Sequence, residues 1–580
     1  MRKTLITLGL CFVFSAFTFA QATEAGTGPR LEVDQYGQQV ETFPIEVTMR
    51  NGVTWFENRE RGYRFWFDGR VQIDFANHHN QRNGTLIGPD GTTANFVYRH
   101  ASGPLQGQIM LDDDGNRIVP EATPHMPGGM TLRRVRFAVK AELTDQWYAE
   151  IDFNMINGRF GLQDAYIQFT PRALPSWMFR VGNFKEDFSM EYTTSSRFVT
   201  MMERPMNITA FNFTRRLGIQ TKWQDMERSP WLRASGGITF QEIDGFTLAH
   251  NVNAVQREEA RGSGPNFTGK VVFMPWATEV NRGLHFGYNI QHRSGRWVSD
   301  DAATIDEHDS RAWHGMRVNS RNAHHVNRTQ YLDTRWFRNG VRGNLFQGVE
   351  VAGFWNGWRF GSEFIWHDMI MDRDLAMFPT FTNADGSPNT TVHARGAYHG
   401  FRELTPGELV DIYARNKRHW GFYAYVGKIL FGGQQRYDIR QSEFTRPTRG
   451  RSWGDIEVLF RYDYVNLNNQ FRDLPVQVLV ANGGGGGTAG NTFGQPGGAG
   501  HNFTFGVNYW INSNMRFTIN YTISHNDVWA NGGGHLNAGG RRNIAVGRDA
   551  NGNFTGDPLS VASDGGVSFN TLQMRLEIAF

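Results

Sequence analysis

The sequence predicts an all-β protein, a transmembrane antiparallel β-barrel with short turns at one rim and long loops at the other. Three observations predict it: apolar and polar residues alternate with period two, the alternating segments are long, and the connections between them alternate short and long. Successive side chains of a strand point to opposite faces, and about ten residues span a bilayer when the strand is tilted. In such a barrel the apolar face meets lipid and the polar face lines the lumen.

The last ten residues, 571–580, show the alternation most clearly. The apolar positions are Leu572, Met574, Leu576, Ile578 and Phe580, and the polar ones between them are Gln573, Arg575 and Glu577. A final strand that ends on Phe is typical of bacterial outer-membrane proteins. Taken alone, this segment also fits an edge strand of a soluble sandwich, so the other segments decide.

The same alternation recurs along the chain. It runs through residues 63–75, 133–143 and 147–154, and further segments begin near Asp164, Trp177, Phe211, Trp231, Phe267, Leu284, Leu345, Trp358, Trp420, Ile456, Phe503 and Met515. A soluble sandwich would show shorter strands with turn signals every ~8–12 residues. We count about fifteen segments, and because single-chain bacterial barrels have even strand numbers, we expect 16.

The connections divide into two classes. Short turns are expected at 144–145, 171–176, 225–230, 276–282, 356–357 and 512–514, and long polar loops at about 77–130, 241–264, 294–343, 368–418, 466–501 and 526–566. Short turns face the periplasm and long loops the exterior in outer-membrane barrels.

The beginning of the chain predicts export. Arg2 and Lys3 precede an apolar run, residues 5–19, that has the length of a signal-peptide core and is too short for a spanning helix. We expect residues 1–20 to be a signal peptide, 21–60 a periplasmic lead-in, and 61–580 the barrel. The single cysteine, Cys11, falls within the signal peptide; acylation there is an alternative, disfavoured by the bulky Leu10. The mature chain would contain no disulfide.

Composition and motifs exclude other classes. A formal net charge of +3 is too small to indicate a nucleic-acid partner, and 45 Phe, 17 Trp and 17 Tyr suit aromatic girdles at the membrane interfaces. No serine-hydrolase or zinc-protease motif is present, and the pairs His324-His325 and His367-Asp368 and the run 306–309 lack the spacing of a metal site. We therefore expect no enzymatic activity and no cofactor.

Five stretches carry a family resemblance: Gly-Arg-Val-Gln-Ile-Asp at 69–74, Leu-Arg-Arg-Val-Arg-Phe at 132–137, Gln-Asp-Ala-Tyr-Ile at 163–167, Arg-Val-Gly-Asn-Phe-Lys at 180–185, and the run 188–205. Together they resemble the phosphate-selective porin O and P family. The resemblance implies a 16-stranded, usually trimeric outer-membrane diffusion channel whose basic residues favour phosphate. The chain is longer than such porins, and the excess lies in the outer loops.

Basic residues on the polar face are the candidate site. We expect the pore-lining and anion-binding residues to be Arg134, Arg136, Lys140, Arg180, Lys185, Arg197, Arg204 and Arg216. A guanidinium stays charged and donates two parallel hydrogen bonds to phosphate oxygens. The alternative is that these cations pair with carboxylates on the same face, such as Asp68, Glu150 and Asp164, and stiffen the wall.

The run 188–207 breaks the alternation, being too polar for a wall strand and too apolar for a free loop. We expect an inward-folding constriction loop near 186–207, with a surface loop as the alternative. The sequence thus predicts a porin for passive diffusion of small hydrophilic solutes that favours anions such as phosphate, surrounded by outer-membrane lipid, as a homotrimer. The alternatives are a non-transporting barrel whose loops bind or scaffold partner proteins, and an outer-membrane enzyme whose catalytic group we cannot place.

Overall fold

The computed structural model describes a large part of the chain. The described residues are 30–33, 35, 38–50, 53–82, 86–87, 126, 128–156, 159–211, 214–240, 265–276, 278–294, 318–327, 329–334, 341–371, 392–395, 401–404, 415–468, 477–479, 491–492, 496–527, 541–544, 559–563 and 566–580. The expected signal peptide, the run 306–309 and most of the expected long loops lie outside them.

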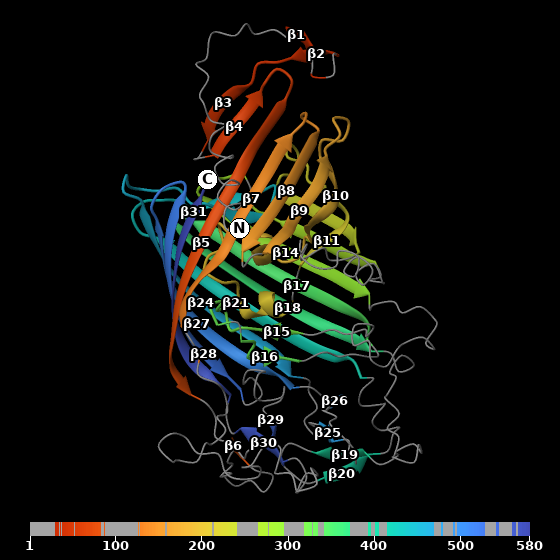
Figure 1. The fold of residues 1–580 in the computed structure, drawn as a ribbon, viewed down its shortest axis with the longest axis vertical. Coiled ribbons are helices and arrows are strands. Elements are labelled where there is room, and N and C mark those ends of the chain that lie inside the picture. The colour runs from red at the N-terminus through yellow and green to blue at the C-terminus, as the bar shows by residue number, and fades with distance from the viewer. Residues whose placement is uncertain are drawn as a thin grey trace, which may run out of the picture.

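Sixteen antiparallel strands close a barrel (Figure 1). In order they are β5 (Tyr63–Arg82), β7 (Gly129–Glu142), β8 (Trp147–Ile156), β9 (Arg159–Phe169), β10 (Trp177–Lys185), β11 (Arg215–Trp223), β12 (Leu232–Thr239), β13 (Asn266–Phe273), β14 (Arg282–Ser294), β17 (Val341–Trp355), β18 (Trp358–Met371), β21 (Lys417–Ile429), β24 (Asp455–Asn468), β27 (Pro496–Trp510), β28 (Met515–Asn526) and β31 (Ser568–Ala579). Each pairs with the next, and β31 pairs with β5 to close the barrel. The predicted fold and strand number are confirmed.

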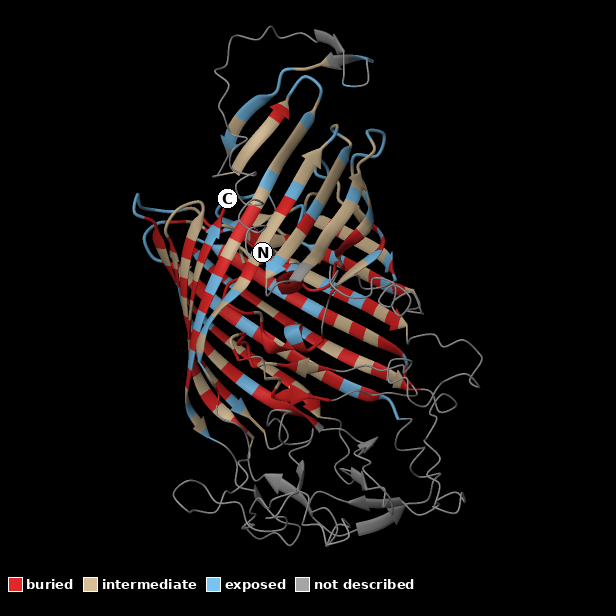
Figure 2. Ribbon diagram, viewed as in Figure 1, coloured by how far each residue is buried: buried red, intermediate tan, exposed pale blue. Residues whose placement is uncertain are grey.

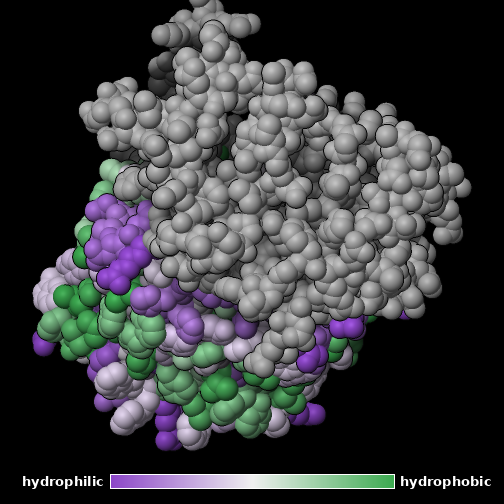
Figure 3. Space-filling model, turned by 90° about the horizontal axis from the view of Figure 1, so that it is seen from below, coloured by the Kyte–Doolittle hydropathy of each residue, from purple (hydrophilic) through white to green (hydrophobic). Residues whose placement is uncertain are grey.

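The period-two pattern places one face of each strand outward and the other inward. In β31 the side chains of Gln573, Arg575 and Glu577 are buried, whereas Ile578 between them and the rim is 39% exposed. The bands of buried and accessible residues in Figure 2 show the same alternation in neighbouring strands. In the part of the outer wall visible in Figure 3, hydrophobic residues form patches along the flank, as a lipid-facing surface requires.

The connections at one rim are short, and we call this the short-turn rim. The tightest is Asn356-Gly357 between β17 and β18, where both residues have positive φ, 46° and 75°. Two consecutive residues of this kind form a hairpin turn that matches the twist of the strands, and Asn-Gly is the sequence that favours it. The connections at the opposite, long-loop rim lie mostly outside the described residues.

The sheet begins earlier than the expected barrel boundary at residue 61. Strands β3 (Glu46–Arg50) and β4 (Val53–Asn58) form a hairpin, and β4 pairs with the first residues of β5. The later residues of the same edge of β5 pair with β31. The hairpin therefore extends the wall beyond the closing seam, at the upper end of the barrel in Figure 1.

Shorter elements complete the described structure. The helices are α2 (Met190–Thr193) and α3 (Met206–Ala210), and the remaining strands are β1 (Arg30–Val33), β2 (Gln39–Thr42), β6 (Leu86–Ile87), β15 (Asn319–Ser320), β16 (Leu332–Asp333), β19 (Val392–Arg395), β20 (Phe401–Leu404), β22 (Arg436–Asp438), β23 (Glu443–Thr445), β25 (Gln477–Leu479), β26 (Asn491–Thr492), β29 (Arg541–Ile544) and β30 (Leu559–Ser563). Within the described ranges, no helix has both the length and the apolar character needed to cross a membrane.

Candidate pore and its charged cavity

The connection between β10 and β11 enters the lumen. We call residues 186–211, which include α2 and α3, the inner segment. Its side chains are almost all buried, and Phe188, Met206 and Phe211 join an apolar cluster with Phe346 and Tyr423 of the inward wall face. Because these wall positions are apolar where most inward positions are polar, the segment has a surface against which to pack.

Polar wall residues fix the path of the inner segment by holding its backbone. Arg461 of β24 donates to the carbonyl of Glu203 at 2.8 Å, Asn508 of β27 to that of Thr200 at 3.0 Å, and Arg516 of β28 to that of Val199 at 3.0 Å. Three neighbouring strands thus satisfy carbonyl groups that form no regular secondary structure, as buried backbone requires.

Glu203 is the centre of the strongest ionic contact of the inner segment. Its carboxylate accepts two hydrogen bonds from Arg133 of β7, at 2.7 and 2.9 Å, and one from Arg575 of β31 at 2.8 Å. Arg575 also donates twice to Asp74 of β5, both at 2.7 Å. The contact joins the inner segment to both sides of the closing seam, and paired charges of this geometry are the form in which a protein tolerates buried ions.

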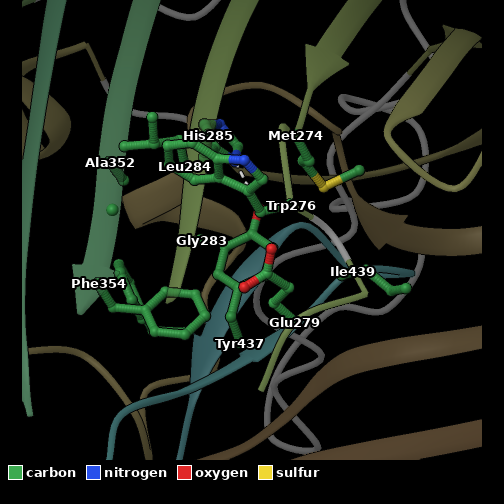
Figure 4. A pocket seen from close by; sticks show the side chains of 12 residues that line it. Met274, Trp276, Glu279, Gly283, Leu284, His285, Ala352, Phe354, Tyr437 and Ile439 are labelled. Atoms are coloured by element: carbon green, nitrogen blue, oxygen red, sulfur yellow. Dashed lines mark hydrogen bonds between the residues drawn. The ribbon is translucent and has the colours of Figure 1, made fainter. Parts of the chain in front are cut away.

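A second connection enters the lumen, from the short-turn rim. We call residues 430–454, between β21 and β24, the rim loop; it contains β22 and β23. Figure 4 shows Tyr437 of this loop beside His285 and Phe354 of the wall, and the Tyr437 hydroxyl lies 2.5 Å from His285 Nδ1. The void that these side chains surround measures only about 20 Å³, roughly the space of one water molecule, so it is a packing gap and no solute site.

The inner segment and the rim loop leave a cavity of about 690 Å³ beside strands β5 to β11. Its lining comes from the wall, from Asp187 and residues 193–198 of the inner segment, and from residues 438–443 of the rim loop. Eight cations line it, namely Arg70, Arg136, Lys140, Arg180, Lys185, Arg197, Arg215 and Lys222. Eight carboxylates line it as well: Asp68, Glu142, Glu150, Asp152, Asp164, Asp187, Asp438 and Glu443. The formal charges of the lining therefore balance.

Most of these charges form ion pairs across strands. Lys140 Nζ lies 3.1 Å from Asp68 and 3.5 Å from Glu150, and Arg215 donates to Asp164 at 2.8 Å. Arg197 of the inner segment also contacts Asp68, which ties the segment to β5. For these residues, the alternative interpretation holds: the lumen cations pair with carboxylates on the same face of the wall.

Three cations of the lining differ from the rest. Arg70 donates to the Ser196 hydroxyl at 2.7 Å, Arg180 donates to Gln168 at 3.0 Å, and Lys185 donates to three carbonyl groups of the inner segment at 3.0 to 3.4 Å. Among the described residues, no carboxylate lies within ion-pair distance of any of the three. The lining carboxylates Asp438 and Glu443 are likewise without an ion pair in the described part of the chain.

The structure brings together five of the eight expected pore residues. Arg136, Lys140, Arg180, Lys185 and Arg197 line the cavity. The other three lie apart from it and hold the protein itself: Arg134 donates to Gln72 at 2.8 Å, Arg204 donates to three carbonyls of the inner segment, and Arg216 lies 3.5 Å from Glu186. The alternation along a strand predicts which side chains point into the barrel. Whether such a side chain reaches solvent depends on the segments that pack inside the lumen.

An aromatic group in the cavity was not singled out from the sequence, which assigned aromatic residues mainly to membrane girdles. Trp55, Trp66, Tyr148 and Tyr166 face the cavity. Trp66 and Asp68 have the same parity, as do Tyr148 and Glu150, so the alternation could have identified these rings as lumenal. No pattern in the sequence indicates that the rim loop enters the lumen, because its contacts are with wall residues distant in sequence.

The histidine pairs considered from the sequence do not gather further ligands. His367 lies against His419, with their Nδ1 atoms 3.2 Å apart, and His324 packs against His78 and Phe569. In the ranges that the structure describes, no group of three or more His, Cys, Asp or Glu side chains could hold a metal ion.

A closed sixteen-stranded barrel with an apolar outer face and a charged cavity inside defines the class: a membrane-spanning pore-type β-barrel. The sequence profile of the phosphate-selective porin O and P family matches residues 105–370 and 391–538. The chain belongs to this family. The match includes the middle of the chain, beyond the five stretches that carry the resemblance.

Individual relatives are distant. A protein of Caulobacter vibrioides described as uncharacterized is 23% identical over 345 residues, which cover 59% of this chain and 56% of that protein, so the chain spans about half the length of this curated relative. The anion-selective porin from Comamonas acidovorans is 9% identical, with 89% of this chain and 100% of that chain covered and a TM-score of 0.39. Trimeric OmpT of Vibrio cholerae is 7% identical, with 90% and 100% covered and a TM-score of 0.38. Likeness at this level carries no argument about solutes or assembly.

Proposed function

We propose that the protein is a passive diffusion pore for small hydrophilic solutes in which inorganic anions, phosphate among them, are favoured. The observation that supports the preference is the set of three lining cations without ion pairs, Arg70, Arg180 and Lys185. Two lining carboxylates, Asp438 and Glu443, are in the same situation, so the uncompensated charge in the cavity is positive.

The cavity is suited to ions for a physical reason. Its wall is made of protein, and a charge in such a confined space is screened less than in bulk water. The guanidinium of Arg180 presents donors in a plane that matches a phosphate edge. We propose that the inner segment, near residues 186–207, is the constriction that forces solutes past these groups. Diffusion through it requires no cofactor or energy source.

The family and the asymmetry of the two rims support a proposal for assembly and sidedness. We propose that three copies associate in the outer membrane, with the short-turn rim toward the periplasm, since outer-membrane barrels place their short turns there. The N-terminal residues 1–20 would direct export as a signal peptide.

Planar-bilayer recording of the purified protein in a potassium chloride gradient tests this function. We expect a steady current with a reversal potential on the anion side, and added phosphate should reduce the chloride current. The double variant Arg180→Gln, Lys185→Gln should move the reversal potential toward zero. Arg172→Gln is the matched control, because Arg172 lies in an exposed turn paired with Asp145 and outside the cavity.

Two outcomes would contradict the proposal at different levels. A current without ion preference, unchanged in the double variant, would leave a general porin without an anion site. Absence of current from barrels shown to be folded would contradict the channel itself and favour a barrel that binds partner proteins through its loops.

A further inference from the structure

We propose that the cavity contains a carbohydrate-binding track, formed by the rings of Trp55, Trp66, Tyr148 and Tyr166, which we call the aromatic arc. The inference rests on the proposed channel function and names a class of solute for it: neutral, ring-shaped, polyhydroxylated molecules such as short oligosaccharides.

The aromatic arc is continuous across the wall. Trp55 of β4 and Trp66 of β5 stack with centroids 4.0 Å apart and an angle of 16°. Trp66 and Tyr148 of β8 lie 6.1 Å apart, and Tyr148 and Tyr166 of β9 lie 6.0 Å apart. Arg180 of β10 covers the end of the arc, with its guanidinium 4.1 Å from the centre of the Tyr166 ring. The rings thus form a row from the β3–β4 hairpin into the cavity.

The aromatic arc is not part of a membrane girdle. A girdle ring must be on the outer face, as is Trp147, which is 43% exposed and adjacent to Tyr148 in the same strand. The four arc rings lie on the opposite, inward face of their strands and line the cavity together with Asp68 and Glu150. Their aromatic surface therefore faces the lumen and not the lipid. A role at the membrane interface does not explain rings in this position.

The chemistry around the aromatic arc suits sugars. A pyranose ring presents a flat face of C–H groups, which the negative face of an aromatic ring attracts, and its hydroxyl groups need both donors and acceptors at the edge. Beside the rings, Glu150 accepts hydrogen bonds from the hydroxyls of Tyr148 at 2.6 Å and Tyr166 at 2.8 Å, and Lys140 lies 3.5 Å from the same carboxylate. Hydrogen-bond donors and an acceptor thus lie beside the tyrosine rings of the track.

Charge and size favour the same class. Eight cations and eight carboxylates line the cavity, so a polyhydroxylated solute meets many hydrogen-bond donors and acceptors there. The volume of about 690 Å³ lies within the range of small-molecule sites, roughly 300–1,000 Å³.

The test uses the full-length folded protein in a planar bilayer, with maltotriose and cellotriose as ring-sugar probes and mannitol as an open-chain polyol. We expect either trisaccharide to interrupt the ion current at concentrations where mannitol does not. Trp66→Ala should weaken the interruption at least tenfold, and Tyr148→Phe, which keeps the ring and loses the hydroxyl, should weaken it less. Trp276→Ala is the matched control, because Trp276 lies in a turn outside this cavity and should leave the interruption unchanged.

The possible failures are distinguishable. If the current is steady and neither trisaccharide interrupts it, or if Trp66→Ala is interrupted as strongly as the unaltered protein, the carbohydrate track is wrong and the channel stands. If folded barrels pass no current, the proposed function fails, and titration of intrinsic tryptophan fluorescence with maltotriose and cellotriose decides. A saturable change that Trp66→Ala abolishes would support the track, and no change would overturn it.

Discussion

At the scale of the residue, the carboxylates inside the barrel are of two kinds. Asp74 and Glu203 are held by guanidinium groups at hydrogen-bond distance and serve to fix the structure. Glu443 of the rim loop is different. Burial raises its pKa to about 7, although Lys185 and Lys222 from the wall and the Ser195 backbone act in the opposite direction; neighbouring Asp438 adds to the rise. A group with this pKa changes its charge within the physiological range.

We therefore predict that anion preference depends on pH. Below the Glu443 pKa of about 7 the carboxyl is protonated and neutral, so the cavity is more positive; above it the carboxylate offsets one cation. The anion preference should fall as pH rises through 7, measured as the reversal potential in a salt gradient. Glu443→Gln should reduce this dependence, and Asp145→Asn, in an exposed turn where Arg172 lowers the Asp145 pKa, should not. A reversal potential that responds to pH equally in Glu443→Gln would contradict the role of this residue.

At the scale of the element, two connections from opposite rims shape one cavity. The inner segment packs against the wall from β17 to β31 and leaves the lumen open beside β5 to β11, and the rim loop limits that opening from the other end. Wall side chains hold both by satisfying backbone and polar groups, as Gln435 does by donating to Glu457 at 2.9 Å. We therefore propose that these two connections set the bore of the pore and that the wall supports them.

Two arginines of the inner segment test this view. Arg204 donates to the carbonyls of Glu191, Tyr192 and Thr194, and Arg197 contacts Asp68 and the Gly69 carbonyl. Because Arg197→Ala with Arg204→Ala removes these contacts, we expect single-channel conductance or ion preference to change, with larger current fluctuations. Arg172→Ala is the control for loss of an arginine away from the cavity. Traces identical to those of the unaltered protein would show that the inner segment does not limit the flow.

At the scale of the whole molecule, one contact joins the closing seam to the lumen. Arg575 connects β31 to Asp74 of β5 and to Glu203 of the inner segment, so strand pairing and filling of the barrel stabilise each other. All three side chains are buried, and a charge left there without a partner cannot be compensated by water.

Arg575→Met should therefore destabilise the barrel. Removing one partner of a buried ion pair costs about 3–5 kcal/mol, because the remaining charge is left unpaired; here Asp74 loses its two hydrogen bonds while Glu203 keeps Arg133. The measurement is denaturant unfolding in detergent, followed by circular dichroism. Arg172→Met removes an exposed pair and should leave the midpoint nearly unchanged. An unchanged midpoint for Arg575→Met would show that the contact contributes nothing to closure.

Most of the fold was predictable from residues close in sequence. The strands from β5 to β31, the Asn356-Gly357 turn and the inward face of β31 all follow from local alternation and turn chemistry. The candidate site was predictable only in part: parity identified Arg136, Lys140 and Arg180 as inward, and broken alternation identified the inner segment. Arg134 and Arg216 have the same signals and lie outside the cavity, because Arg134 bonds to Gln72 of β5 and Arg216 lies against Glu186 of the inner segment.

The sequence by itself determined the class of fold, the number of strands and the face of most charges in the wall, because strand alternation and turn preference are local properties. Arg133 is an exception: it shares the parity of Val135 and Phe137, but the register shifts beside it and its side chain bonds to Glu203 in the lumen. Only the tertiary structure decided which cations are paired, that the rim loop enters the lumen, and that the rings of the aromatic arc form one row. Those features arise from contacts between residues hundreds of positions apart, such as Arg575 with Asp74. The local sequence pattern cannot predict such contacts.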